Sequence, residues 1–203
     1  MASLVEVKVP KRELKRIDNM MSAIPKRIPS VMSTSINRTA KTARSRITKE
    51  IAKHITLKQK DIRSQIYIEK ASRSRWRADV RVRGNKIPLI KFGARKLKGA
   101  KGGIGYKISK TGSREKILYD PDTNRVFIGT MRSGYIGVYA RLERPTWSGG
   151  KRTKIIQRFG PSLPSVYENA QGLARTILRD TKDTLIKNLR DRVEWELLKA
   201  KKK

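Results

Sequence analysis

The spacing of apolar residues along the chain predicts helices at both ends and strands in the middle. Residues 4–9 alternate apolar and charged side chains, which predicts a short strand ended by a proline. Apolar residues then recur at every third or fourth position in residues 14–24 and 36–55, a pattern typical of amphipathic helices. A short additional helix is expected to end at Ile62.

Particular residues predict where these helices begin and end. We expect Pro25 and Pro29 to stop the first helix and Ser30 to cap the second. Thr56 and Gln59 have the spacing of a capping box for the short helix. The side of the second helix opposite its apolar stripe carries basic residues, and we interpret it as a solvated face: Arg38, Lys41, Lys49 and Lys53.

From residue 65 the apolar period changes to two, which predicts strands. The expected strands are 66–69, 76–82, 87–92, 116–119, 125–130, 135–141 and 155–159. Gly84-Asn85 predicts a two-residue hairpin between the second and third strands, and Pro88 places the third at a sheet edge. A long helix is expected from Pro164 to the end of the chain.

Together these elements predict an α+β fold in one domain, residues 1–203. A helical part, 1–63, precedes a β-rich part, 64–160, which contains a basic glycine-rich loop at 93–103. The long C-terminal helix occupies 161–203. We expect one small, twisted, mostly antiparallel sheet from the central segment, packed against the N-terminal helix pair and the C-terminal helix.

The charge of the chain predicts a polyanionic partner. The formal net charge is +33, and residues 41–116 carry 24 basic and 5 acidic side chains, so the excess belongs to the middle of the chain. Residues 91–116 alone contain nine basic residues and six glycines against one acid, Glu115. We expect this basic loop to be extended and mobile until it binds an anion, and to reach DNA.

A second group of cations lies on one side of the strand at 76–82 and just before it. Arginines alternate there with apolar residues, with Asp79 as the single interruption. This face could follow a phosphate backbone, or it could keep an edge strand soluble, and the residues favour neither. The predicted DNA contacts of loop and strand are Lys91, Arg95, Lys96, Lys98, Lys101, Lys107, Lys110, Arg114, Arg75, Arg77, Arg81 and Arg83.

The long C-terminal helix predicts a contact between subunits. At ~1.5 Å per residue it would reach roughly 50 Å, more than a body of this size needs. We therefore expect its far end to pack on a neighbouring subunit through Leu185, Leu189, Val193 and Leu197.

Catalytic chemistry has little support in the sequence. The chain has no cysteine and one histidine, His54, which we interpret as a surface residue at a helix end. No nucleotide-binding loop or nucleophile elbow is present, and Asp120 and Asp122 are typical of a turn rather than a calcium loop. We expect no catalytic residue, metal, cofactor or small-molecule substrate. Without a signal-peptide core or an apolar run near ~20 residues, we expect a soluble protein made in the cytosol.

Several segments in order resemble the phage minor tail protein Z family, the tail completion proteins of long-tailed phages. They are residues 87–95 (IPLIKFGAR), 127–134 (FIGTMRSG), 137–141 (GVYAR) and 159–162 (FGPS), and the helical residues 36–40 (INRTA) also fit. The sequence departs from the family pattern in an enlarged loop at 146–154 and in Gln157-Arg158, the two residues that precede the FGPS segment.

The resemblance implies a virion protein in the neck, at the head-proximal end of the tail, that passes through the host cytoplasm during assembly. It implies contacts with the tail terminator and the head–tail connector, a homo-oligomeric ring of six, and no membrane. Basic loops would then contact genomic DNA in the channel without reading its sequence. Two alternatives stay open: a free-standing nucleic-acid-binding protein of ribosomal or chromatin type, and a basic nuclease.

Overall fold

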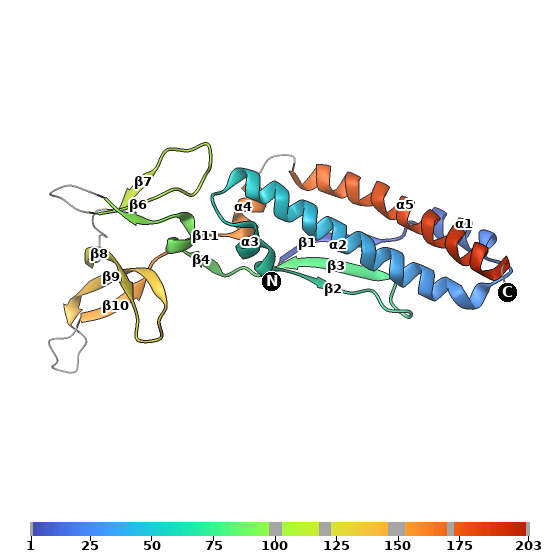
Figure 1. Cartoon of the computed structure of the whole chain (residues 1–203), viewed down its shortest axis with the longest axis horizontal. Helices are drawn as coiled ribbons and strands as arrows, with labels where there is room; N and C mark the ends of the chain where they lie inside the picture. The colour runs from blue at the N-terminus through green and yellow to red at the C-terminus, as the bar shows by residue number, and fades with distance from the viewer. Residues whose placement is uncertain (1, 98–102, 118–122, 146–152, 170–172, 202–203) are drawn as a thin grey trace. The chain divides into compact units, whose positions relative to one another are not determined.

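The computed structural model of the chain describes residues 2–97, 103–117, 123–145, 153–169 and 173–201 (Figure 1). These residues form two compact units, each built from separate stretches of the sequence. Unit 1 consists of Met1–Glu50, Arg63–Gly84 and Tyr167–Lys203, and unit 2 consists of Ile51–Ile62 and Asn85–Val166. The single folding domain expected from chain length stays a prediction.

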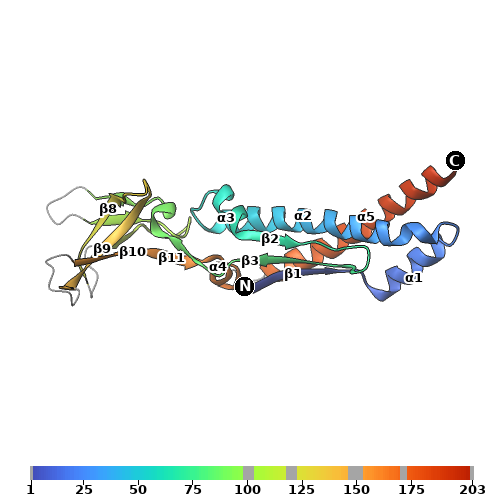
Figure 2. The same ribbon diagram turned by 90° about the horizontal axis from the view of Figure 1, so that it is seen from below.

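Unit 1 combines long helices with one three-stranded sheet. Its helical elements are α1 (Lys11–Met20), the 3-10 turn η1 (Pro25–Arg27), most of α2 (Ile28–His54), the end of α3 (Gln59–Gln65) and α5 (Leu173–Lys201). Its strands are β1 (Ala2–Lys8), β2 (Ile66–Glu69) and β3 (Arg77–Val82). The strand order is β1-β3-β2, with both pairs antiparallel, and α2 lies along the sheet (Figure 2).

The apolar stripe predicted for the second helix is confirmed as part of the core of unit 1. Ile36 and Ile47 of α2 are 0% exposed. A buried polar layer joins α2 to α5: Asn188 Nδ2 donates to Thr39 Oγ1 at 2.9 Å, and Ser35 Oγ donates to the Asn188 carbonyl at 3.2 Å. Because buried polar groups are costly when unpaired, this layer favours one register between the two helices.

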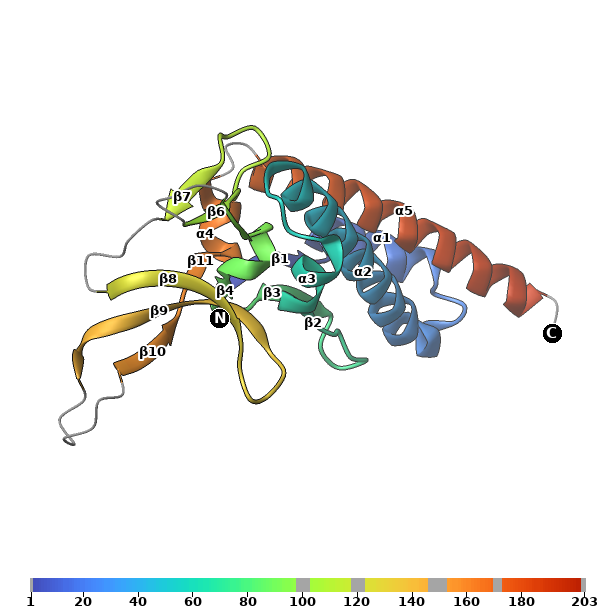
Figure 3. The same cartoon turned by 60° about the vertical axis from the view of Figure 1, so that its left-hand side comes forward.

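Unit 2 consists mainly of short strands. Besides the end of α2 and the start of α3, it contains β4 (Lys86–Pro88), the 3-10 turn η2 (Leu89–Phe92), β5 (Arg95–Lys96), β6 (Ile104–Tyr106), β7 (Glu115–Ile117), β8 (Thr123–Thr130), β9 (Ile136–Pro145), β10 (Thr153–Gln157), β11 (Phe159–Ser162) and most of α4 (Leu163–Asn169). The strands form three antiparallel sheets, β11-β4, β5-β6-β7 and β10-β9-β8 (Figure 3).

Phe92 is a large, fully buried side chain of unit 2, at 1% exposure. The turn η2 that carries it begins after Pro88 and ends at Gly93, whose φ of 67° suits glycine. Gly160 of β11 lies directly against the ring, because a Cβ there would be 2.6 Å from Phe92 Cε2. Phe92 of the FGAR segment therefore packs against Gly160 of the FGPS segment.

The α+β class is confirmed, but the single expected sheet is four small sheets in the described residues. The predicted hairpin at Gly84-Asn85 is wrong, because β3 is paired on both sides by β1 and β2, and β4 pairs with β11. Of the residues expected as a strand at 87–92, only those up to Pro88 belong to a strand, β4, and the rest form the 3-10 turn η2. Pro88 has no N–H to extend the pairing, which agrees with its predicted place at an edge.

Several predicted helix boundaries are also corrected. Pro29 lies inside the first turn of α2, where its missing N–H costs nothing, so α2 begins before Ser30. Thr56 does not cap α3, because its hydroxyl donates to the Lys107 carbonyl instead. In the described residues, the expected C-terminal helix consists of α4 and α5. No helix among the described residues combines the length and the apolar character that a membrane span needs.

Candidate nucleic-acid interface

The arginine-bearing strand predicted at 76–82 is the central strand of the unit 1 sheet. Since β3 lies between β1 and β2, the alternative of an edge strand kept soluble by charge is wrong. The register places Asp79 opposite Glu6 of β1 and opposite Glu69 of β2. Three carboxylates therefore form a row across the side of the sheet that also carries the arginines.

Arginine side chains neutralise this row of carboxylates. Asp79 is 0% exposed, and its Oδ2 lies 3.2 Å from Arg75 Nη2 and 3.1 Å from Arg77 Nε. Arg81 Nη2 lies 2.9 Å from Glu69 Oε2. The pKa of Arg77 is raised, chiefly because its Nε donates to Asp79. A phosphate would have to compete with these carboxylates for three of the four guanidiniums predicted to contact DNA.

A second cationic surface lies on the β5-β6-β7 sheet, at the base of the predicted loop. Arg95 is paired with Gly105 and Gly105 with Lys116, so these positions share one side of the sheet. Arg114 lies over the same side, because its Cδ would be 3.1 Å from a Cβ on Gly105. Arg95, Arg114 and Lys116 are all exposed, and we call them the cationic face.

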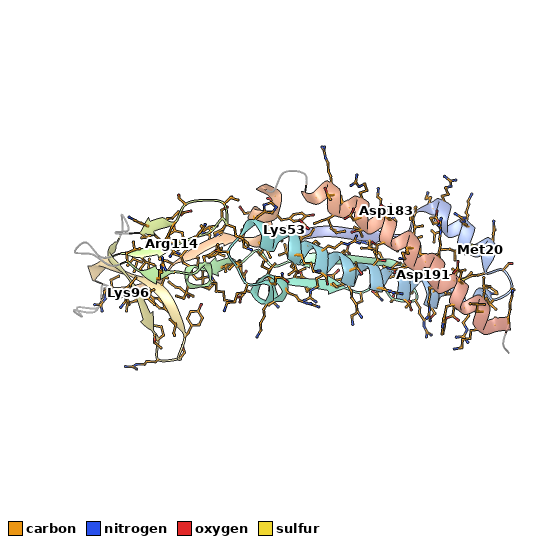
Figure 4. All side chains as sticks on the ribbon, turned by 45° about the horizontal axis from the view of Figure 1, so that its top comes forward. Met20, Lys53, Lys96, Arg114, Asp183 and Asp191 are labelled. Carbon is orange, nitrogen blue, oxygen red and sulfur yellow. The ribbon has the colours of Figure 1, made fainter. Side chains whose placement is uncertain are left out.

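The acid of this sheet lies on its other side. Glu115 is paired with Tyr106, one position away from the residues of the cationic face. Burial, and then a hydrogen bond with Glu115, raises the pKa of Tyr106 to about 12. Among the described residues, no carboxylate forms an ion pair with the cationic face. Lys96 is exposed and lies on the same side of the β5-β6-β7 sheet as Tyr106. Figure 4 labels Lys96 and Arg114.

The remaining predicted DNA contacts have different surroundings. Lys91 Nζ donates to Asp61 Oδ1 at 2.6 Å, so its charge is already balanced. Lys107 is half-buried, whereas Lys110 and Arg83 are exposed. Two further residues lie outside the described part of the chain, Lys98 and Lys101. Arg95 and Lys96, near the start of the predicted loop, form β5, which pairs with β6.

Most of the apolar residues predicted to contact a neighbouring subunit are covered within unit 1. Leu185, Leu189 and Val193 are 3%, 2% and 1% exposed, and Leu197 is half-buried. They line α5 where it contacts β1 and α1. A subunit contact of α5 stays a prediction, and the large exposed apolar side chains in the described part of α5 are Leu178, Trp195 and Leu198.

Two features of these surfaces were missed from the sequence. Lys116 lies in the basic stretch and has the same strand parity as Arg114, but it is not among the predicted DNA contacts. Glu6 and Glu69 were not connected to the arginines, because the pairing register of distant strands cannot be read from alternation alone.

Residues with catalytic chemistry do not gather in the described structure. His54 is the last residue of α2 and is exposed, as predicted. Within the described ranges, no group of three or more histidine and acidic side chains could hold a metal ion. The row of Glu6, Asp79 and Glu69 is instead neutralised by guanidiniums.

The comparisons with known proteins point to one family. The family model described as prophage minor tail protein Z (GPZ) matches residues 11–203, nearly the whole chain. No curated protein matches the chain, and no solved structure does.

Proposed function

This chain belongs to the prophage minor tail protein Z family, and we propose that it completes the head-proximal end of the phage tail and helps to join tail and head. The resemblance seen in the sequence is thereby confirmed. The family carries a structural role in the phage tail and not an enzymatic one, so the nuclease alternative is set aside. Other tail or virion proteins are its partners, and the virion tail is its location.

The proposal places the chain in the neck, as a ring of six between the tail terminator and the head–tail connector, after assembly in the host cytoplasm. A ring requires side chains that are free to contact another copy. Exposed apolar residues of α5, such as Leu178 and Leu198, are available for such contacts because the core of unit 1 does not cover them.

DNA contact through the cationic face is the second part of the proposal. Arg95, Arg114 and Lys116 share one side of a sheet, are exposed, and have no described carboxylate partner. The one acid of that sheet is engaged with Tyr106 on the other side. Unbalanced cations in fixed positions favour phosphate oxygens without regard to base sequence. This absence of a carboxylate partner among the described residues is the observation that carries the DNA contact.

A nonsense mutation in the gene of the encoding phage tests the role in tail completion. We expect full heads and separate tails to accumulate, and plasmid-borne protein to restore joined, infectious particles. Tails that still join heads without this chain would refute the proposal. A nonsense mutation in a tail-fibre gene serves as the control, because it should leave the head–tail joint intact.

A free-standing nucleic-acid-binding protein is the second candidate, and the net charge of +33 favours it. This candidate predicts a monomer that retains RNA during purification and is missing from purified tails. The tail proposal predicts the opposite distribution, with the chain recovered in tails after treatment with nuclease.

A further inference from the structure

An open hollow in unit 1 is lined by basic side chains from two segments that are far apart in the sequence. Its volume is about 550 Å³, and it lies where η1 and the first turn of α2 come close to the connection between β2 and β3. Figure 1 shows this connection at the end of the sheet nearest the start of α2. We call the hollow the basic hollow, and its lining residues are Lys26, Arg27, Pro29, Ser30, Arg73 and Ser74.

Hydrogen bonds fix the backbone of both segments. Asn37 of α2 holds Ala71 in both directions: its Nδ2 donates to the Ala71 carbonyl at 2.9 Å, and the Ala71 N–H donates to its Oδ1 at 2.8 Å. The Arg73 carbonyl accepts a hydrogen bond from Trp76 Nε1 at 2.8 Å. In η1, the Arg27 N–H donates to the carbonyl three residues earlier at 3.0 Å. The backbone that places the cations is therefore ordered before a ligand binds, which lowers the entropic cost of binding.

The cations of the basic hollow have no carboxylate partner among the described residues. Lys26, Arg27 and Arg73 are exposed, and no described carboxylate forms an ion pair with any of them. Arg75, on the same connection as Arg73, is different, because its Nη2 lies 3.2 Å from Asp79 Oδ2. The basic hollow therefore concentrates positive charge that the described fold does not balance.

The acid that lies closest to this arrangement is already paired with an arginine. Arg27 also lines a neighbouring hollow of about 230 Å³, together with Glu196 and Lys199. Glu196 is 4% exposed, and its Oε1 lies 2.9 Å from Arg192 Nη2. Lys199 adds a further positive charge to the neighbouring hollow. The surroundings of Arg27 therefore stay cationic.

The side chains of the basic hollow suit phosphate oxygens. A guanidinium presents paired N–H donors to a phosphate, an ammonium adds a point charge, and hydroxyls such as those of Ser30 and Ser74 add further donors. Among the described lining residues none is aromatic and Pro29 alone is apolar. The basic hollow therefore lacks a platform for base stacking and the apolar centre of a protein interface, and a chain of phosphates fits it better than either.

We propose that the basic hollow binds the phosphodiester backbone of nucleic acid, as a site separate from the cationic face. Its three cations lie outside residues 91–116 and are not among the DNA contacts predicted from the sequence. The basic hollow belongs to unit 1 and the cationic face to unit 2, so substitutions at one site leave the residues of the other in place. Contacts of this kind hold phosphates without reading base sequence.

Alkylation of a single thiol tests this site directly, because the chain has no cysteine. Ser74→Cys places a thiol in the lining, and Ser64→Cys, at an exposed position before β2, is the matched control. With a random-sequence duplex at about ten times its Kd, about nine-tenths of the sites are occupied, so alkylation of Ser74→Cys by iodoacetamide should slow about tenfold. The control should slow far less. Equal slowing in both variants, or none in Ser74→Cys, would overturn the proposal.

Two other anions identify the ligand in the same assay. Polyglutamate carries carboxylates along a chain, and inorganic phosphate carries phosphate oxygens without a backbone. At equal concentration of negative charge, we expect both to protect the Ser74→Cys thiol far less than the duplex does. Equal protection by polyglutamate would assign the basic hollow to an acidic protein segment, and equal protection by inorganic phosphate would assign it to the free anion. Either result would overturn the proposal.

Removing the cations tests the site without a chemical probe. If each cation contacts one phosphate, the triple variant Lys26→Gln with Arg27→Gln and Arg73→Gln should make the salt dependence of duplex binding shallower by about 2.7, at about 0.9 per contact. The matched control removes the same charge from exposed residues of α5: Arg179→Gln with Lys182→Gln and Lys187→Gln. All six positions are exposed, so both variants should keep the thermal midpoint of the free protein.

The outcomes of this comparison separate the basic hollow from the proposed function. An unchanged salt dependence in the triple variant of the basic hollow, or an equal change in its control, would overturn this site alone. A shallower dependence there supports the site even if substitutions in the cationic face change nothing, in which case the DNA contact of the proposed function has failed. The role in tail completion is tested by the nonsense mutation and does not enter this measurement, which uses the free protein.

Discussion

Neutralising the cationic face should make DNA binding less sensitive to salt by an amount that can be calculated. Each phosphate contact contributes a slope of about −0.9 to the logarithm of affinity against the logarithm of salt concentration. If Arg95, Arg114 and Lys116 each contact one phosphate, the triple substitution to glutamine should make the slope shallower by about 2.7. Between about 50 and 200 mM salt, the wild-type affinity would then fall about 40-fold more than that of the variant.

Fluorescence anisotropy with a labelled random-sequence duplex measures this slope directly. The matched control is Arg38→Gln with Lys41→Gln and Lys49→Gln, three exposed residues of α2. Both triple variants lose the same net charge, so a general effect of charge would change both slopes equally. A slope that is unchanged in the first variant, or changed as much in the control, would refute the assignment of the cationic face.

Three further predictions concern stability. Asp79→Asn should lower the free energy of unfolding by about 2 kcal/mol, because the arginines around this buried site lose their carboxylate partner. The control Glu6→Gln removes a carboxylate on the surface and should cost under about 1 kcal/mol. Urea denaturation measures both values. Gly160→Ala should lower the free energy of unfolding by about 1–3 kcal/mol in the same assay, because the added Cβ meets a buried phenylalanine ring. The control Gly84→Ala has open space around the added Cβ and should be near neutral. The pKa of Tyr106 is about 12 in the folded protein and near 10.0 in the unfolded chain, so the free energy of unfolding should fall as pH rises between these values. Tyr106→Phe should reduce this pH dependence in thermal melts recorded at a series of pH values. An unchanged pH dependence would contradict the prediction.

Local patterns predicted the elements of this chain well wherever one period held over many residues. The apolar stripe of α2 and the alternation in β3 are both found as expected, because each depends only on which side of an element is buried. Pairing between distant strands was predicted poorly. Gly84-Asn85 has the local signature of a hairpin, but the flanking strands pair with β1, β2 and β11 instead. Tertiary pairing overrode the turn preference, and no local signal could show that.

The candidate DNA interface was predictable as a region but not as a set of residues. The excess of basic residues after residue 90 indicates the region in which the cationic face lies. Composition does not show, however, that Lys91 has a carboxylate partner and Arg95 has none among the described residues. The partner of Lys91 is Asp61, thirty residues earlier in the sequence. Which cations are free is decided by where the acids fold.

The placement of the acids gives two similar runs of basic residues different surroundings. On the unit 1 sheet, Glu6, Asp79 and Glu69 come from three strands and meet in one register, so the arginines beside them stabilise the sheet. On the β5-β6-β7 sheet the single acid is shifted by one position, and alternation places it on the other side from Arg95 and its neighbours. A shift of one residue in the position of an acid thus separates an ion-pair network from a surface on which no described carboxylate pairs with the cations. The same reasoning predicts that Lys116→Glu, which restores a carboxylate to the cationic face, should weaken DNA binding more than Lys116→Gln in the anisotropy assay. Equal effects of the two substitutions would show that Lys116 lies away from the phosphates.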